Sequence, residues 1–501
     1  MFPQPAKRTI SFSTPLAGKA AIAARSLAVP ALIGIDTLAI VSSFFIAFYL
    51  RDPLLKNLFP GIFPKELLAD TLNNIWWFPL IMLFCLLYEN LYQKRLPFWT
   101  EVEHILKAVT LAIVFSVVLL YMTKTAFEVS RTLMAMIWLL MMFTLPLFRY
   151  YGKLVLVKAG IWKKPVLIIG AGQTACLIAA ALKREKTTGY EAIGILNDRG
   201  KRAETTTSMA ACHIPILGSV EEAEPVIKKT RVKDIFIAMP ALPAAGTVTL
   251  TNRLQPLVEN VMLIPDLFGL SMNGIEAQHF FEEQVLILNI KNRLKPLFNR
   301  ALKRSFDLIV GSVLMLILTP LLLLLAFLIK LESKGPVFYN STRIGQRGKS
   351  FRCHKFRTMY TRADEMLAEH LASCNQARRE WEEYRKLING DPRVTKTGRF
   401  LRRFSLDELP QLINVVIGEM SLVGPRPYLP EEKELMGGFY QEIIVAKPGM
   451  TGLWQVSGRN QIGFEGRMKL GAWYVKNWSL WLDLVIILRT FRVVIKGVGA
   501  Y

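Results

Sequence analysis

The sequence contains few cysteines and histidines for its length. Among 501 residues there are five of each, and the cysteines form no Cys-x-x-Cys pair. This scatter argues against a zinc site and favours a reducing, cytoplasmic setting. No histidine is spaced with cysteine or glutamate as a set of metal ligands. We expect His354, beside Lys355, to make a local polar contact rather than to act as a base.

Acidic residues are also scarce relative to basic ones. Lys and Arg total 62 against 39 Asp and Glu, a net charge of +23, and 52% of the residues are hydrophobic. So basic a balance indicates either nucleic acid or an anionic membrane face as the partner. No nucleic-acid-binding motif is recognisable, and the basic residues flank apolar runs. We therefore predict a membrane protein without a nucleic-acid partner.

Apolar runs fill the first 150 residues, at about 27–50, 75–92, 105–122 and 132–150. Each approaches the roughly 20 residues needed to cross a bilayer, so residues 1–150 are predicted to form a four-helix transmembrane bundle. Basic residues precede the first run and follow the last, which places both ends on the cytoplasmic side. Asp36 lies within the first run, and we expect it to pair with another helix.

Strand-like and helix-like segments alternate over residues 151–290, which predicts a Rossmann-like α/β domain with a mostly parallel sheet. Gly170-Ala-Gly172-Gln-Thr-Ala175 follows the first strand and opens a helix, and Asp198 closes the second strand. In dinucleotide-binding folds such glycines approach a pyrophosphate and such an acid binds ribose. A lone fingerprint is weak evidence. Gly170, Gly172 and Asp198 either bind a nucleotide cofactor or nucleotide-sugar, or the fingerprint has a structural or regulatory role, with the glycines kept for packing.

Residues 308–329 carry no charge, and Pro320 lies near their middle. A straight helix of this length could cross a bilayer. Basic residues dominate both flanks, however, which favours the cytoplasmic face for both ends. Pro320 removes a helix hydrogen bond, and the Thr319 hydroxyl can bond to a freed carbonyl. We therefore predict a re-entrant membrane helix over 308–329, with a kinked fifth span as the alternative. Lys303 and Arg304 are expected to contact lipid headgroups.

Two adjacent acids, Asp407 and Glu408, follow a strongly basic segment that begins at Arg393. Pro410 fits a helix only in its first turn, so a helix should begin near Leu406 or Asp407, with both carboxylates at its N-terminus. There the helix dipole would lower a carboxylate pKa, and free N–H groups could receive a phosphate. An ionised carboxylate in a cationic setting suits attack on a phosphoryl group or the holding of Mg²⁺. A capping carboxylate beside a solvated charge run is the alternative.

A series of motifs over residues 291–501 resembles the bacterial polyprenyl-phosphate phosphoglycosyl transferases of the monotopic type, in their large multi-domain form. The motifs are Lys303–Asp307, Thr319-Pro320, Gly335–Tyr339, Arg343–Gly348, Lys355–Met359, Ser405–Gln411, Gly418–Pro427 and Lys447–Arg459. The resemblance implies that residues 291–501 form a mainly helical catalytic domain with the re-entrant helix, on the cytoplasmic face of a bacterial inner membrane.

The resemblance also implies a reaction. A sugar-1-phosphate, which we expect to be galactose-1-phosphate, moves from a UDP-sugar to undecaprenyl phosphate and UMP is released. This would be the first membrane step of O-antigen, capsule or exopolysaccharide synthesis, and UDP-glucose stays open as the donor. Asp407 would form a covalent aspartyl-phosphosugar, and Glu408 would bind Mg²⁺. The expected substrate-binding residues are Lys355, Arg357, Arg402, Arg403, Arg426 and Arg459.

Other interpretations make different predictions. In a direct ternary mechanism Asp407 would only bind metal, and no UMP would be released without the lipid. A nucleotide-sugar oxidoreductase or dehydratase would use the Gly170 fingerprint, but it needs a catalytic Tyr/Lys pair that is not recognisable. A non-enzymatic export scaffold built on the four spans would leave the acids at 407 and 408 unexplained. Inner-membrane lipids and a second copy of the chain, as a homodimer, are the expected further partners.

Overall fold

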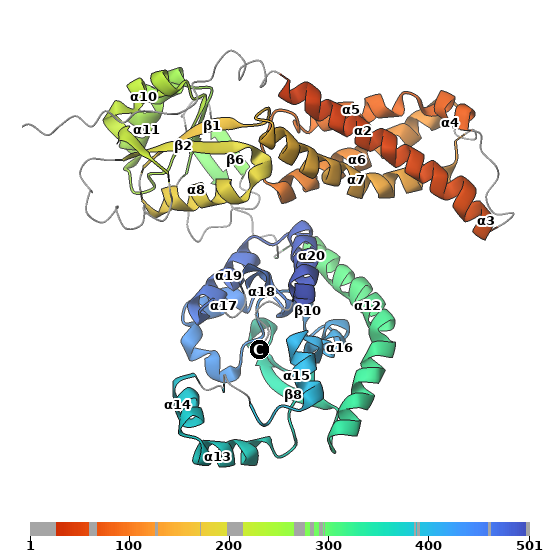
Figure 1. The fold of residues 1–501 in the computed structure, drawn as a ribbon, viewed down its shortest axis with the longest axis vertical. Coiled ribbons are helices and arrows are strands. Elements are labelled where there is room, and N and C mark those ends of the chain that lie inside the picture. Colours follow the sequence, from red (N-terminus) through yellow and green to blue (C-terminus); the bar gives the residue numbers. More distant parts are fainter. Residues whose placement is uncertain are drawn as a thin grey trace, which may run out of the picture. The chain divides into compact units, whose positions relative to one another are not determined.

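The computed structural model describes residues 27–59, 68–125, 129–170, 172–197, 214–264, 276–280, 285–289, 294, 296–384, 387, 391–458 and 462–496. The chain forms two compact units, Met1–Asp266 and Leu267–Tyr501 (Figure 1).

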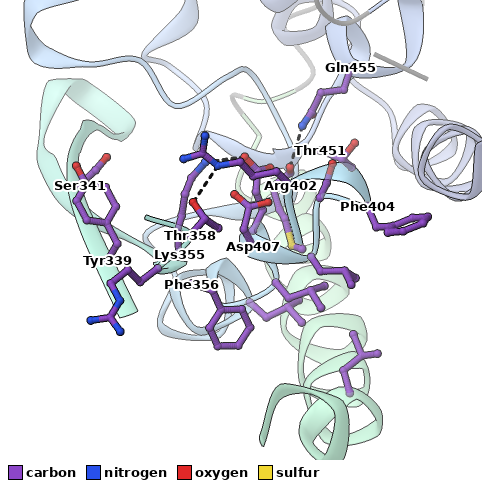
Figure 2. Close-up of a pocket in the computed structure, with 18 of the residues that line it drawn as sticks. Tyr339, Ser341, Lys355, Phe356, Thr358, Arg402, Phe404, Asp407, Thr451 and Gln455 are labelled. Carbon is purple, nitrogen blue, oxygen red and sulfur yellow. Dashed lines mark hydrogen bonds and ion pairs between the residues drawn. The ribbon is translucent and has the colours of Figure 1, made fainter. Parts of the chain in front are cut away.

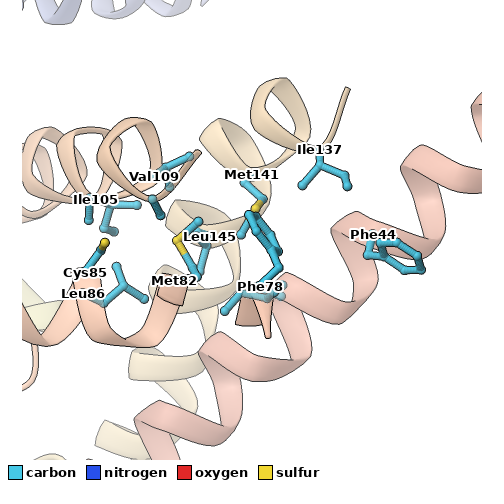
Figure 3. Close-up of a cluster of buried hydrophobic side chains, with 14 of the residues drawn as sticks. Phe44, Phe78, Met82, Cys85, Leu86, Ile105, Val109, Ile137, Met141 and Leu145 are labelled. Carbon is cyan, nitrogen blue, oxygen red and sulfur yellow. The ribbon is translucent and has the colours of Figure 1, made fainter. Parts of the chain in front are cut away.

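The first unit begins with apolar helices that bury a shared cluster of aliphatic and aromatic side chains (Figure 3). Within the described residues of this unit, the segments long and apolar enough to cross a membrane are Ala28–Leu58, Thr71–Tyr88, Phe98–Met122 and Arg131–Lys158. The predicted apolar helices are therefore present, and their passage across a bilayer stays a prediction. The helices are α2 (Ala28–Tyr49), the π-helical turn η1 (Leu50–Leu55), α3 (Lys56–Leu58), α4 (Leu68–Ile75), α5 (Phe78–Tyr88), α6 (Phe98–Met122) and α7 (Arg131–Lys158).

Asp36 pairs with another helix, as predicted. Its carboxylate, fully buried in α2, accepts hydrogen bonds of 2.6–2.7 Å from the Arg149 guanidinium of α7, and one of 2.6 Å from the Tyr92 hydroxyl. Glu101 of α6 accepts from Arg149 at 3.0 Å and from Lys153 at 2.6 Å. Two acids and two bases thus neutralise one another, which offsets the large cost of burying each charge.

The α/β part of the first unit contains the predicted parallel sheet. Strands β1–β5 are all parallel and lie in the order β3-β2-β1-β4-β5, with apolar clusters on both faces. The elements are β1 (Lys164–Ile169), α8 (Gln173–Arg184), β2 (Tyr190–Asn197), β3 (Ile216–Ser219), α10 (Ala223–Thr230), β4 (Asp234–Ile237), α11 (Ala244–Leu254) and β5 (Asn260–Leu263), with 3-10 turns η2 (Lys186–Thr188), η3 (Val220–Glu222) and η4 (Gln255–Leu257).

The second unit is mainly helical, as predicted, with short strand pairs that the sequence analysis did not foresee. Strands β6 and β7 pair antiparallel, as do β8 and β9, whereas β10 and β11 pair parallel. The strands are β6 (Glu276–Phe280), β7 (Val285–Asn289), β8 (Phe338–Ile344), β9 (Ser350–Phe356), β10 (Ser421–Val423) and β11 (Gly449–Thr451). The helices are α12 (Leu297–Glu332), α13 (Ala363–Ser373), α14 (Asn375–Tyr384), α15 (Lys396–Arg403), α16 (Gln411–Ile417), α17 (Phe439–Ile443), α18 (Leu453–Ser457), α19 (Phe464–Lys476) and α20 (Leu480–Lys496), with 3-10 turns η5 (Gln346–Gly348), η6 (Leu406–Glu408), η7 (Pro430–Glu432) and η8 (Glu434–Met436).

Helix α12 contains the uncharged segment and runs along one side of the second unit (Figure 1). It is continuous through Pro320, so the predicted turning point is not a break in the helix. The Thr319 hydroxyl donates to the Met315 carbonyl at 2.7 Å. That bond does not satisfy the carbonyl of Leu316, which lies four residues before Pro320 and loses its partner there.

Both ends of α12 pack against the same globular unit. Near its start, Asp307 is buried and accepts hydrogen bonds from the Ser421 hydroxyl and from a backbone N–H of β10. Near its end, Leu325 and Ile329 are buried against Phe356 and Leu401. Most of the apolar residues between these two contacts are exposed. These contacts hold both halves of α12 against the same folded unit.

Lys303 and Arg304 do not take the predicted role of lipid-headgroup contacts. The Lys303 ammonium is buried and donates to the Asp483 carboxylate at 2.7 Å and to the carbonyl of Val423 at 3.1 Å. The Arg304 guanidinium donates to two carbonyls in the last turns of α16, each at 2.7 Å. Both cations therefore hold α12 to the core of the second unit. Arg304 also neutralises the negative, C-terminal end of α16.

Candidate active site

Asp407 and Glu408 lie in the 3-10 turn η6, between α15 and α16. The turn begins at Leu406, where the helix start was predicted, and α16 itself begins only at Gln411. Ser405 enters the turn with φ of 55°, a left-handed conformation that non-glycine residues seldom adopt. The chain therefore reverses sharply at Ser405. Both carboxylates follow that reversal and line one cleft.

A lysine from a distant strand completes the acidic pair. The Lys355 ammonium of β9 donates to Oε1 of Glu408 at 2.7 Å. Asp407 lies beside the Arg402 guanidinium, whose Nε donates to the Thr358 hydroxyl at 2.9 Å (Figure 2). Glu408 is thus paired directly, whereas Asp407 has cations near it but no direct ion pair with any residue that the structure describes.

The pKa of Asp407 is raised, not lowered as predicted. Burial is the main cause, and the neighbouring Glu408 carboxylate adds to it, bringing the pKa from 3.8 to about 6. Lys355 and Arg402 act in the opposite direction but do not cancel these effects. The sequence-based prediction considered the helix end alone, whereas desolvation of the carboxylate outweighs it. The pKa of Lys355 is also raised: burial lowers it, but the Glu408 charge outweighs burial.

These groups line a cleft of about 910 Å³. This volume is near the upper limit for small-molecule sites, which suits two reacting substrates better than one small ligand. The cleft has a polar and basic wall, which includes the carboxylates, and an apolar wall. The polar wall includes Tyr339, Arg343, Lys355, Arg402, Asp407 and Glu408, and the apolar wall includes Leu314, Leu318, Leu412, Met450, Ile487 and Phe491.

The predicted substrate-binding residues divide into those in the cleft and those away from it. Lys355, Arg357 and Arg402 line it. Arg357 is already engaged, because its guanidinium donates to the carbonyl and the hydroxyl of Ser333 at 2.7 Å each. It therefore anchors the chain just after α12. Arg403 is exposed, and its guanidinium lies 5.7 Å from the ring centre of Phe404. Arg403 is not among the described residues that line the cleft.

Arg426 is not among the described residues that line the cleft, but it lies next to one of them. Its guanidinium is 5.6 Å from the ring centre of Trp454, which lines the cleft, and 3.8 Å from the Glu432 carboxylate. Arg459 falls outside the described residues. Arg343 and Trp454 also line the cleft but were not predicted as site residues, although both stand within motifs that carry the family resemblance. The motifs were the available signal, and only the fold shows which of their side chains face the cleft.

Residues 298–497 match the family described as bacterial sugar transferase. The chain is 39% identical over 82% of its length to an uncharacterised sugar transferase of Haemophilus influenzae, covering 85% of that protein. It is 37% identical, again over 82% of its length, to the undecaprenyl-phosphate galactose phosphotransferase of Salmonella typhimurium, covering 84% of it. The chain belongs to the bacterial sugar transferase family. The predicted resemblance and the prediction of a transferase are thereby confirmed.

This sugar transferase also has relatives named for another sugar. It is 30% identical over 67% of its length to the UDP-glucose:undecaprenyl-phosphate glucose-1-phosphate transferase of Escherichia coli, covering 68% of that protein. Residues 89–265 match a second family, described as a CoA-binding domain. A solved structure of UDP-D-quinovosamine 4-dehydrogenase from Vibrio fischeri matches 21% of the chain and 80% of its own length, at 28% identity and a TM-score of 0.18. So low a score carries no argument about the fold or the reaction.

The carboxylates of the transferase's cleft suit Mg²⁺ chemically. This ion prefers oxygen ligands and usually takes one or two carboxylates together with substrate phosphates and water. Asp407 and Glu408 are adjacent and face the cleft. In the part of the chain that the structure describes, no group of three or more His, Cys, Asp and Glu side chains converges. The residues therefore fit an ion shared with a bound diphosphate rather than one enclosed by protein.

The glycine fingerprint of the α/β part is explained partly by packing. Gly170 has φ of +107°, and a Cβ there would lie 2.5 Å from the carbonyl oxygen of Ala238. Glycine is thus required by the close approach of the backbone that follows β4, which supports the structural interpretation at this position. A Cβ on Gly172 would meet nothing within 4 Å, so packing does not explain that glycine. Asp198 lies outside the described residues.

Proposed function

We propose that this transferase moves galactose-1-phosphate from UDP-galactose to undecaprenyl phosphate. The observation that carries the proposal is the cleft itself, which has a basic, carboxylate-bearing wall and an apolar wall to which the long apolar helix α12 and α20 contribute. A water-soluble diphosphate and a phosphate on a hydrocarbon chain could meet there. Galactose is favoured because relatives named for it match 82% of the chain, whereas those named for glucose match 66–68%.

The covalent route uses Asp407 as the nucleophile. An oxygen of its carboxylate attacks the β-phosphorus of the donor, and an acyl phosphate bond forms. The bond from that phosphorus to the bridging oxygen breaks, and the oxygen leaves with UMP. An oxygen of the lipid phosphate then attacks the same phosphorus, and the Asp407 carboxylate is released unchanged. Two displacements at one centre give undecaprenyl-diphosphate-galactose.

The environment of Asp407 supports this role. With a pKa of about 6, the carboxylate is mostly ionised above pH 7, and it is more basic than an ordinary aspartate, which favours nucleophilic attack. Lys355 and Arg402 supply positive charge for the phosphates. Glu408 would hold Mg²⁺ beside the donor. When bound, this ion would neutralise the diphosphate and stabilise the departing UMP.

The packing of α12 supports a re-entrant path for this helix. A helix that crossed a bilayer of about 30 Å would place its ends on opposite sides, yet both ends of α12 are buried against one globular unit. We propose that α12 enters and leaves the inner membrane on the cytoplasmic face, where UDP-sugars are found. A place at the start of O-antigen, capsule or exopolysaccharide synthesis, and a homodimer, are further parts of the proposal that rest on the family resemblance.

The test is the intact mass of the detergent-solubilised protein after incubation with UDP-galactose and Mg²⁺ but no lipid. We expect a hexose-phosphate adduct and released UMP, and neither in Asp407→Asn. An adduct with UDP-glucose but not with UDP-galactose would correct the sugar alone. No adduct with either donor, while lipid product still forms, would overturn the covalent route and favour the ternary mechanism.

A further inference from the structure

Part of the cleft's lining is an apolar region to which two helices contribute. We call this region the apolar arm and define it by Leu314 and Leu318 of α12, Ile487 and Phe491 of α20, and Met450 of β11. Leu314, Leu318, Ile487 and Met450 pack against the core of the second unit. The walls of the arm are therefore supported from behind rather than being loose surface side chains.

Two hydroxyls lie next to residues of the arm in the sequence, and both are already paired. The hydroxyls of Thr451 and Thr490, which both line the cleft, lie 2.7 Å apart and are hydrogen-bonded to each other. The Thr490 hydroxyl also bonds to the carbonyl of Ile486 at 2.7 Å. A polar ligand in the arm could bind to these hydroxyls only by breaking the hydrogen bonds that they already make. The arm consequently suits a hydrocarbon, in contrast to the basic wall around Asp407.

The arm lies next to surfaces that suit membrane hydrocarbon. On α12, the residues beside its lining are apolar and strongly exposed, among them Leu316 and Ile317. On α20, Leu488 is likewise exposed, as is Phe491 at the rim of the arm. Exposed apolar surface of this kind marks a membrane or ligand contact. A chain that arrived through the membrane could thus enter the arm sideways, between α12 and α20.

We propose that the apolar arm binds the isoprenoid chain of the acceptor lipid, at the units next to its phosphate. The inference rests on the proposed function, because it takes the acceptor to be a polyprenyl phosphate. With the chain in the arm, the phosphate reaches the part of the same cleft that holds Asp407, Lys355 and Arg402. The arm then aligns the second nucleophile and excludes water from the reacting phosphorus.

Matched substitutions on each helix test the arm. Leu318→Trp on α12 and Ile487→Trp on α20 would fill it, whereas the controls Ile317→Trp and Leu488→Trp change exposed neighbours that do not line the cleft. We expect the first two to raise KM for undecaprenyl phosphate at least about tenfold, which is about 1.4 kcal/mol. We expect no comparable rise in KM for the UDP-sugar, and no effect in the controls.

Equal acceptor KM values in all four variants would overturn the inference. UMP release without lipid shows that each variant is folded and that its donor site works, so loss of the arm is distinguished from unfolding. If the wild type transfers no sugar from any UDP-sugar, the proposed function fails, and the arm is judged by the binding experiment alone.

Binding is measured by photocrosslinking with a ten-carbon prenyl phosphate that carries a diazirine, using Asp407→Asn to prevent turnover. We expect crosslinked peptides from 311–320 and 484–493, and competition by undecaprenyl phosphate but not by phosphatidylglycerol. Equal competition by phosphatidylglycerol would show that the arm takes bulk phospholipid, and crosslinks confined to other segments would show that the chain binds elsewhere. Either result would overturn the inference.

Discussion

Replacing Asp407 by asparagine should abolish transfer and stabilise the folded protein at the same time. The folded state raises the pKa of this carboxyl from 3.8 to about 6, so it binds the proton more tightly than the unfolded chain does. Its contribution to stability is therefore greatest below about pH 3.8 and is lost as the pH rises through about 6. Above that pH the folded protein carries the cost of a buried, ionised carboxylate.

The magnitude follows from the same pKa values. The difference between 3.8 and about 6 corresponds to at most about 3 kcal/mol at pH 7.5, and to about half of that at pH 5. Asparagine has nearly the same shape and no charge, so it should recover most of this energy. In a unit of this size, about 1 kcal/mol moves a thermal midpoint by about 2–4 °C. We expect Asp407→Asn to raise the midpoint by several degrees at pH 7.5 and by clearly less at pH 5.

The assay is thermal unfolding of the solubilised protein, followed by tryptophan fluorescence at both pH values. Glu408→Gln is the matched control, because it removes the adjacent charge but leaves the Lys355 ammonium without the carboxylate that it contacts at 2.7 Å. That variant should have a lower midpoint at pH 7.5. A lower midpoint for Asp407→Asn at pH 7.5, or a gain that does not change with pH, would refute the reasoning about burial.

Three further predictions concern the pH profile, the membrane helices and the α/β part. The value of kcat/KM should rise as the pH passes through about 6, the pKa of the nucleophile. Glu408→Gln should move the midpoint of this rise to a lower pH, because it removes the neighbouring charge that helps to raise the pKa. An unchanged midpoint would contradict this contribution of Glu408. Arg149→Met leaves the buried Asp36 carboxylate without its guanidinium partner and should lower the free energy of unfolding by about 3–5 kcal/mol. This destabilisation should appear as a loss of monodisperse protein in detergent. Wild-type behaviour would argue against the buried pair. Gly170→Ala should lower the thermal midpoint, because its Cβ would lie 2.5 Å from a carbonyl, whereas Gly172→Ala should change it little. A similar fall for both would contradict the packing argument.

Much of the architecture could be predicted from local sequence patterns. The apolar runs predicted the long helices, and the alternating segments predicted a parallel sheet, which the structure contains. The start of the turn at Leu406 followed from Pro410, which cannot donate a hydrogen bond. Asp36 was expected to find a helix partner, and it does. These features depend on periodicity, backbone sterics and the cost of a lone buried charge, all of which are readable in a short stretch of chain.

The identity of each partner and the ionisation of the nucleophile were decided only by the tertiary structure. Lys303 binds Asp483, 180 positions away, and not a lipid headgroup. Lys355 reaches Glu408 across 53 positions, and burial in the cleft raises the pKa of Asp407 against the expected effect of the helix dipole. Desolvation and pairing depend on which distant segments meet. A sequence can show that a carboxylate sits among cations, but only the fold determines how much water and charge surround it.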